Sequence, residues 1–354
     1  MDWVLQEKKG SDTVFGVHRP YVADAKNNMT IFGRALETPV GPAAGPHTQL
    51  AQNIIASYYA GARFFELKTV QKMDGAELSA CVNKPCILAD DEGYNCEWST
   101  ELTVPDAMGE YIKAWFILHV IAGEFGLGAQ DGFQFNLSVG YDLEGIKGDK
   151  INTFIDGMME AKDTAVFKEC RQWLLDHADR FQKFTREDIE AIPSNVCNSA
   201  TISTLHGCPP QEIESIANYL LTEKHLNTFV KCNPTLLGYD FARKTMDEMG
   251  YDYMVFGDFH FRDDLQYADA VPMLSRLMKL SEELGLEFGV KITNTFPVDV
   301  TRNELPSEEM YMSGKSLFPL SISLAARLSE EFNGRLRISY SGGADYYNID
   351  KIVG

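Results

Sequence analysis

The chain has 354 residues and a formal net charge of −19, which argues against nucleic-acid binding because an acidic surface repels phosphate backbones. No stretch approaches the roughly 18 unbroken apolar residues that a membrane span needs, so none is predicted. The seven cysteines form no CxxC pair and follow no export signal, which favours reduced thiols in the cytoplasm.

Seven strands are expected in chain order, each as a short apolar run bounded by turn residues. They cover 39–45, 64–70, 132–139, 199–204, 227–232, 287–295 and 335–341. Helical patterns alternate with them at 49–61, 105–123, 150–168, 209–224, 239–249, 271–285 and 317–332. Residues 71–104 have an irregular pattern, and 170–196 form a charged excursion. The pattern of 251–263 does not indicate which type of secondary structure it forms.

This alternation predicts right-handed βαβ crossovers and a parallel sheet, as in a (β/α)8 TIM-type barrel with its active site at the carboxyl ends of the strands. A doubly wound open sheet is the alternative, but no G-x-G-x-x-G motif follows a first strand. A barrel of only seven strands would leave two sheet edges unpaired. We therefore expect a barrel truncated before its eighth strand, which would lie beyond Gly354 in a longer polypeptide.

One compact domain is expected, because no internal repeat or linker interrupts the pattern. Residues 1–37 are predicted to form an N-terminal extension, and 38–354 an incomplete barrel. The barrel is predicted to carry inserts at 71–104, 170–196 and 251–286.

Small residues and lysines stand at the expected carboxyl ends of several strands. They are the run from Gly41 to Gly45, Lys68, Lys231 and the pair Gly342-Gly343. Flavin mononucleotide (FMN) needs Gly-rich turns for its phosphate, a cation at the ring edge that gains charge on reduction, and small residues under the ring. Each feature alone is usually a plain turn or a solvated lysine. Their joint order along the chain favours a flavin site.

Eight short motifs follow the order of a known family: TPVGPAAGPHT, AGARFFELKTV, FNLSVGYD, STLHGCPPQEIESI, FVKCNP, VKITNTFP, YMSGKS and SYSGGAD. They resemble the FMN barrel of dihydroorotate dehydrogenases and dihydropyrimidine dehydrogenase. The chain is most similar to the amino-terminal barrel of the bacterial selenate reductase subunit family. The resemblance implies FMN within 38–354, and iron–sulphur clusters, FAD and NAD(P)H in modules outside this chain.

The resemblance also implies roles for single residues. The flavin contacts would be Ala43 and Ala44 beneath the ring, Lys68 and Lys231 at the ring and ribityl chain, and Gly314, Gly342 and Gly343 at the phosphate. Asn294 and Thr295 match a pair that bonds the amide edge of the substrate ring, and an amide side chain can both donate and accept.

Cys208 matches the loop cysteine that acts as general acid in pyrimidine reduction, where a thiol protonates one carbon while hydride reaches its neighbour. The chain departs from the family at two substrate positions. Leu205 or His206 replaces one Asn, and Asp142 replaces the other, which indicates either a ring other than uracil or altered protonation demands. His206 is either a further acid–base group or a loop histidine with one backbone bond, and Cys208 is either the acid or a bystander thiol.

Two clusters contain metal-ligand types but are interpreted otherwise. Cys81, Cys86 and Cys96 are spaced more loosely than usual zinc or iron–sulphur ligand runs. Segment 257–264 contains Asp258, His260, Asp263 and Asp264, but its aromatic residues favour a lid over the barrel mouth. No metal site is therefore predicted.

The leading hypothesis is an FMN-dependent oxidoreductase domain of a larger multi-module protein, acting on a planar nitrogen heterocycle such as a pyrimidine- or purine-like base. Its partners would be iron–sulphur and FAD modules or redox subunits. One alternative is a catalytically silent docking barrel of a multi-subunit electron-transfer complex. Another is a flavin-free lyase with Lys68 or Lys231 as a Schiff-base amine. Selenate reduction is not favoured, because no Arg clamp for an oxyanion can be placed.

Overall fold

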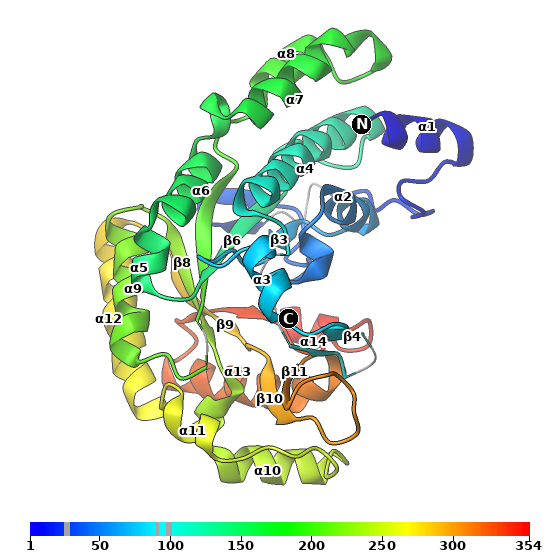
Figure 1. Cartoon of the computed structure of the whole chain (residues 1–354). Helices are drawn as coiled ribbons and strands as arrows, with labels where there is room; N and C mark the ends of the chain where they lie inside the picture. Colours follow the sequence, from blue (N-terminus) through cyan, green and yellow to red (C-terminus); the bar gives the residue numbers. More distant parts are fainter. Residues whose placement is uncertain (25–28, 90–91, 97–100, 205) are drawn as a thin grey trace. The chain divides into compact units, whose positions relative to one another are not determined.

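The computed structural model describes residues 1–24, 29–89, 92–96, 101–204 and 206–354. Within these described residues, the main sheet has six strands, in the spatial order β12 (Arg337–Tyr340), β9 (Phe288–Ile292), β8 (Asn227–Cys232), β7 (Cys197–Ser203), β6 (Gln134–Gly140) and β3 (Phe64–Glu66) (Figure 1). The pairs β3–β6, β8–β9 and β9–β12 are parallel. The predicted parallel α/β fold is confirmed.

The chain divides into two compact units. Unit 1 comprises Met1–Ala76, Ser99–Ser138 and Lys147–Ser199, and unit 2 comprises Glu77–Trp98, Val139–Ile146 and Ala200–Gly354. Strands β6 and β7 contribute residues to both units. The predicted division into an extension at 1–37 and a barrel at 38–354 stays a prediction. None of the helices in the described part of the chain has the length and apolar character that a membrane crossing requires.

Unit 1 is built around the long helix α4 (Val104–Phe125), which confirms the helix expected at 105–123. Its first turn is capped by the Thr103 hydroxyl, which accepts a hydrogen bond from Asp106 N–H at 3.3 Å. It ends at Gly126, whose φ of 65° suits glycine. Helix α4 packs on α2 (Ala51–Ala60), α6 (Asp149–Met159) and α7 (Ala165–Asp176). The unit also contains α1 (Asp2–Ser11), β1 (Met29–Ile31), β2 (Arg34–Leu36), η2 (Pro46–Thr48), η3 (Ala161–Asp163), η4 (Ala178–Arg180) and α8 (Arg186–Ala191).

The first expected strand, at 39–45, is wrong, because the structure assigns no strand there. The segment nevertheless runs beside β3. The N–H groups of Arg63 and Glu66 donate to the carbonyl oxygens of Val40 and Pro42 at 2.9 and 3.2 Å. Pro39 and Pro42 have no N–H to return, so a regular ladder cannot form.

Two further expectations need correction, and one undecided segment can now be assigned. The single helix at 150–168 is two helices, α6 and α7, because Thr164 caps α7 by accepting from Phe167 N–H at 3.3 Å. The described part of 71–104 contains α3 (Gly75–Cys81), β4 (Ile87–Leu88) and β5 (Tyr94–Asn95) rather than only irregular chain. The undecided stretch 251–263 contains α11 (Phe259–Asp263).

In unit 2, helices pack against the strands that come last in the chain, β8, β9 and β12. Helix α9 (Pro210–Thr222) contacts β8, and α12 (Tyr267–Leu284) contacts both β9 and α9, so that α9 and α12 lie side by side (Figure 1). Helix α13 (Phe318–Glu331) contacts β9 and β12. The remaining helices of the unit are α5 (Leu143–Lys147), η5 (Pro234–Leu237), α10 (Tyr239–Glu248), η6 (Gly314–Leu317) and α14 (Ile349–Val353).

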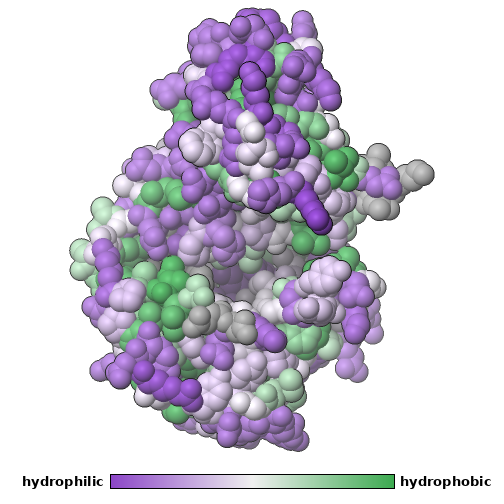
Figure 2. Space-filling view, turned by 90° about the vertical axis from the view of Figure 1, so that its right-hand side faces the viewer, coloured by the Kyte–Doolittle hydropathy of each residue, from purple (hydrophilic) through white to green (hydrophobic). Residues whose placement is uncertain are grey.

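A second, antiparallel sheet of unit 2 was not expected from the sequence. Its order is β10 (Phe296–Asp299), β11 (Glu309–Met312), β5 and β4. Buried aromatic rings join it to segment 251–266, with the Phe256 and Phe296 centroids 4.8 Å apart. Hydrophilic side chains predominate in the α7 and α8 region at the top of Figure 2.

Candidate active site

A row of polar side chains crosses one face of the sheet in unit 2. The register pairs Lys231 of β8 with Lys291 of β9, and Lys291 with Ser339 of β12. Paired residues on neighbouring parallel strands point to the same face, about 4.8 Å apart. Lys231 Nζ also donates to the hydroxyl of Ser203, the last residue of β7, at 2.9 Å. Alternate residues such as Val230 are buried and apolar.

Burial lowers the pKa of both lysines in this row. It lowers the pKa of Lys231 to about 8 and that of Lys291 to about 7. Lys291 is only 3% exposed, and its pKa falls further because desolvation penalises the charged ammonium. Two neighbouring amines that hold their protons weakly suit an anionic or electron-rich ligand, which would restore their charge.

Two glycine turns meet beyond the end of β12. Gly342 and Gly343 have φ values of 117° and 73°, and Gly314 at the start of η6 has 75°. A Cβ on Gly343 would lie 3.2 Å from the Gly314 carbonyl oxygen and 2.7 Å from the Phe318 Cβ. A Cβ on Gly342 would lie 2.4 Å from Ser321 Oγ. The structure therefore brings together the three glycines predicted for the phosphate end, where backbone amides can approach an anion closely.

The two residues predicted to hold the substrate ring, Asn294 and Thr295, follow the carboxyl end of β9. Asn294 N–H donates to the Cys232 carbonyl at 2.7 Å, and Asn294 Oδ1 accepts from Thr295 N–H at 3.0 Å. Both residues are partly exposed. Their substrate role stays a prediction.

Asp142, the third predicted substrate residue, caps the short helix α5. Its Oδ1 accepts a hydrogen bond from Gly145 N–H at 2.7 Å. Glu212, in the first turn of α9, accepts from the neighbouring Leu143 N–H at 2.7 Å. This arrangement explains an acid at position 142 by local structure, and a further contact with substrate stays a prediction.

Cys208 stands just before α9, among acidic groups. Burial, together with the nearby carboxylates of Glu212, Asp142 and Asp264, raises the pKa of its thiol to about 11, against a lowering hydrogen bond from Thr204. The group is therefore a protonated thiol at neutral pH. Such a thiol can donate a proton but is a poor thiolate nucleophile.

His206 lies in a buried polar cluster between the ends of β7 and β8. Its Nδ1 bonds Asp264 Oδ2 at 2.7 Å, and its side chain is 8% exposed. The Tyr311 ring stacks on it, with centroids 5.7 Å apart and planes 7° apart. Its Nε2 is buried and has no hydrogen-bond partner among the described residues. Leu205, the alternative match to the family's Asn, lies outside the described residues.

The Asp264 carboxylate is bonded from four directions. Besides His206, it accepts from Gly207 N–H at 2.6 Å, Asn233 Nδ2 at 3.0 Å and the Thr235 hydroxyl at 2.6 Å. Burial alone would raise its pKa, but the bonds from His206, Thr235 and Gly207 bring the pKa below its ordinary value. Asp264 is therefore ionised at neutral pH.

Two further side chains of segment 257–264, Asp258 and His260, have separate partners. Asp258 pairs with Arg262, and His260 Nε2 bonds Glu309 Oε1 at 2.9 Å. Among the described residues, no three His, Cys, Asp or Glu side chains gather as metal ligands.

The predicted flavin residues of unit 1 stand near the end of β3. Lys68 is 1% exposed, and its Nζ lies 3.6 Å from Glu101 Oε1. Ala43 and Ala44 are partly exposed and precede η2. The roles of Lys68, Ala43 and Ala44 stay predictions.

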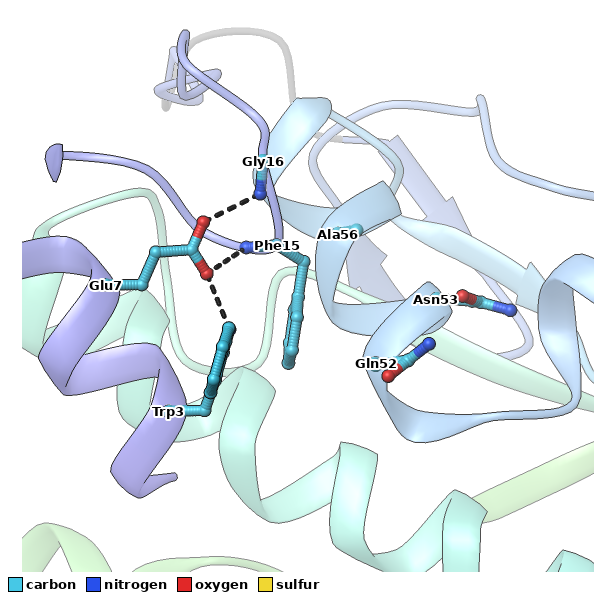
Figure 3. Close-up of a pocket in the computed structure, with 7 residues that line it drawn as sticks. All are labelled: Trp3, Glu7, Phe15, Gly16, Gln52, Asn53 and Ala56. Atoms are coloured by element: carbon cyan, nitrogen blue, oxygen red, sulfur yellow. Dashed lines mark hydrogen bonds between the residues drawn. The ribbon is translucent and has the colours of Figure 1, made fainter.

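Unit 1 also has a pocket between α1 and α2, lined by Trp3, Glu7, Phe15, Gly16, Gln52, Asn53 and Ala56 (Figure 3). Its carboxylate, Glu7, accepts bonds from the Trp3 indole and the Phe15 and Gly16 N–H groups. The Thr13 hydroxyl bonds it at 2.6 Å and contributes most to lowering its pKa. The hydrogen bonds of the Glu7 carboxylate therefore all serve to hold the N-terminal turn in place.

Sequence reasoning missed Lys291 and the role of Asp264. Lys291 stands inside the strand motif VKITNT, and a lysine within a buried parallel strand was the available signal. Asp264 is 58 residues from His206 in sequence, and no spacing rule joins them.

A family model described as "Oxidoreductase YgfK, N-terminal TIM-barrel domain" matches residues 15–354. The chain therefore belongs to this family of oxidoreductase TIM-barrel domains, and the predicted barrel class is confirmed.

Among curated proteins, "Putative oxidoreductase YgfK" of Escherichia coli strain K12 is 48% identical over 363 residues, and its counterpart in Escherichia coli O157:H7 matches equally. The alignment covers 99% of this chain and 35% of either relative, so the chain spans about a third of their length. Among solved structures, ligand-free type DHODH from Eimeria tenella matches at 15% identity and a TM-score of 0.49, over 97% of this chain and 82% of that chain.

Proposed function

We propose that this chain is the FMN-binding domain of a larger oxidoreductase and exchanges electrons with a planar nitrogen heterocycle, such as a pyrimidine- or purine-like base. The observation that carries the proposal is the pair of half-buried Lys231 and buried Lys291, side by side on β8 and β9 near their carboxyl ends. In TIM barrels, active sites lie at that end of the strands.

The residues of unit 2 fit FMN in chemistry and position. The ammonium groups of Lys231 and Lys291 would stabilise the negative charge that the flavin ring gains on reduction. The turns at Gly314 and Gly343 would offer backbone amides to the phosphate, in a place that side chains could not share. When bound, FMN supplies hydride transfer.

The substrate ring would be held and protonated by side chains from the same strand ends. Asn294 and Thr295 suit the alternating donors and acceptors of a lactam or ureide edge. Cys208 would give its S–H proton to the carbon next to the one that receives hydride, and the electron pair of that bond would stay on sulphur. The raised pKa of Cys208 keeps this proton available at neutral pH.

The length of the relatives supports further modules beyond this domain. We infer that iron–sulphur and FAD modules, with NAD(P)H as an electron source or sink, lie in the remaining two thirds of such a protein, and that it works in the cytoplasm. The narrower label of a selenate reductase subunit rests on motif resemblance alone.

An anaerobic reoxidation experiment tests the function. The flavin-loaded protein is reduced and mixed with uracil, thymine, hypoxanthine or xanthine, and flavin oxidation is followed in the visible band. We expect at least one base to reoxidise the flavin, and C208A to slow that reaction about 100-fold. The matched control is C170A on α7, since burial also raises the pKa of Cys170 to about 11.

The outcomes separate cofactor from substrate. A protein that binds no flavin would overturn the cofactor assignment. A bound, reduced flavin that none of the bases reoxidises would overturn the substrate class.

A further inference from the structure

The His206 imidazole is held on every side except one. Asp264 bonds Nδ1, the Tyr311 ring covers one face, and the His260 ring meets it edge-on with centroids 5.5 Å apart. Asn233 Nδ2 lies 3.3 Å from Nδ1, although its shorter bond, 3.0 Å, goes to Asp264. Only Nε2 lacks a partner among the described residues.

The bonding around Asp264 fixes where the imidazole proton lies. An ionised carboxylate can only accept, so the neutral ring must carry its proton on Nδ1 and leave a lone pair on Nε2. A buried acceptor without a partner is destabilising, and most buried polar atoms in native proteins find one. A ligand that offers a proton at this point would remove that cost.

We propose that His206 is an acid–base residue that exchanges a proton with a ring nitrogen or oxygen of the bound heterocycle through Nε2, and that Asp264 is its positioning residue. This inference rests on the proposed function and adds a second proton path to that of Cys208. Cys208 would give its proton to a ring carbon, whereas His206 would exchange a proton with a ring nitrogen or oxygen.

The step needs no oxidant. The Nε2 lone pair forms a bond to the ring proton, the electrons of the broken N–H or O–H bond stay on the ring, and the imidazolium faces the Asp264 carboxylate. The reverse transfer returns the proton. A buried carboxylate stabilises this imidazolium as it forms, which is the role of the acid in a His–Asp pair.

Charged and titratable groups meet His206 from several elements. Asp264 follows α11, and His260 lies within α11 and is bonded to Glu309 of β11. Tyr311 comes from β11. Cys208 stands two residues on, and Glu212 lies in the first turn of α9. His260 Nε2 is engaged by Glu309, whereas Nε2 of His206 is buried without a hydrogen-bond partner among the described residues.

The positioning role is tested first, without any substrate. The flavin-loaded protein is labelled with 15N-histidine, and H206Q identifies the signals of His206 in long-range 1H–15N spectra. We expect wild-type protein to show the Nδ1–H tautomer and D264N to lose that preference. The matched control H225N changes an exposed histidine with a φ of 51°, which Asn tolerates, and should leave the His206 signals in place.

The acid–base role is tested on the reduced flavin. H206Q should slow reoxidation by the heterocycle about 100-fold. D264N should slow it less and change its pH profile, and D264E should restore part of the rate. Reoxidation by ferricyanide, which takes electrons without a proton at a ring atom, should be the same in all four proteins.

Three results would overturn the proposal. Wild type and D264N could show the same tautomer, which removes the positioning role. Wild type could be reoxidised by a heterocycle at a rate that H206Q matches, which removes the acid–base role alone. Wild type could be reoxidised by no heterocycle, which removes the proposed function and this inference together.

Discussion

Two buried acid–base pairs in this chain show how a structural pair differs from a candidate catalytic one. In unit 1, Arg63 Nε donates to Glu37 at 2.6 Å, and its Nη1 and Nη2 donate to the Tyr58 and Leu127 carbonyls at 2.9 and 3.1 Å. The other Glu37 oxygen accepts from Ala129 N–H at 2.6 Å. In unit 2, Asp264 is equally well bonded, but its partner His206 keeps a buried nitrogen without a described partner.

The two pairs differ in how fully their polar atoms are hydrogen-bonded rather than in how deeply they are buried. A fully bonded buried pair holds its surroundings in one arrangement and leaves nothing for a ligand to do. A pair with one open atom, near strand ends that carry two neighbouring lysines, has capacity left for chemistry. We therefore expect the Arg63–Glu37 pair to serve stability, and the His206–Asp264 pair is the one we propose for function.

The largest expected effect is on stability. E37A leaves the Arg63 guanidinium buried without its carboxylate, and we expect it to lower the free energy of unfolding by about 3–5 kcal/mol. The control R276A removes an exposed pair with Glu214 and should cost at most about 1 kcal/mol. Urea unfolding followed by circular dichroism measures both. Equal losses in the two variants would break the distinction between a buried and an exposed pair.

The next effect concerns flavin affinity. K231M or K291M removes a charged hydrogen-bond donor worth about 1.5–3 kcal/mol, so each should weaken FMN binding at least about tenfold. K279M on the exposed face of α12 is the control. Fluorescence quenching of FMN reports the three dissociation constants. If the Lys231 and Lys291 variants bind FMN as tightly as K279M does, the lysine row is not the flavin site.

A pH dependence follows from the same lysines. The free site has pKa values of about 7 and about 8, and an anionic ligand raises both, so binding takes up protons above that range. Affinity should therefore fall as the pH rises from about 7 to about 9, by up to about tenfold per pH unit for each lysine. K291M should show a shallower fall than wild type. An affinity that rises with pH over this window would have the wrong sign for ammonium ligands.

The smallest effect separates close packing from backbone conformation. Gly343 and Gly238 have φ values of 73° and 85°, but an added Cβ meets the Phe318 Cβ at 2.7 Å in the first case and nothing within 4 Å in the second. G343A should therefore cost about 1 kcal/mol more stability than G238A and also weaken FMN binding. G238A should leave binding unchanged. Identical behaviour of the two variants would show that the turns do not pack as described.

Much of the fold could be predicted, because strands buried on both faces form continuous apolar runs and helices have a different period. The prediction of a strand at 39–45 was wrong because two prolines interrupt its hydrogen bonding. The antiparallel sheet was missed because β4 and β5 have only two residues each, too few for a pattern.

The candidate site was predictable where a motif places a residue directly after a strand, as for Gly342, Gly343 and Asn294. It was not predictable where contacts are distant in sequence. Asp264 reaches His206 only because the loop after α11 lies beside the loop after β7, and no local sequence pattern predicts that contact.

The most direct test of the central claim is a titration of flavin-free protein with FMN, followed by the visible spectrum. We predict saturation at one FMN per chain, with a shifted and structured flavin band that marks a ring removed from water. A flavin spectrum unchanged at every protein concentration would contradict the assignment of Lys231, Lys291 and the glycine turns as a flavin site.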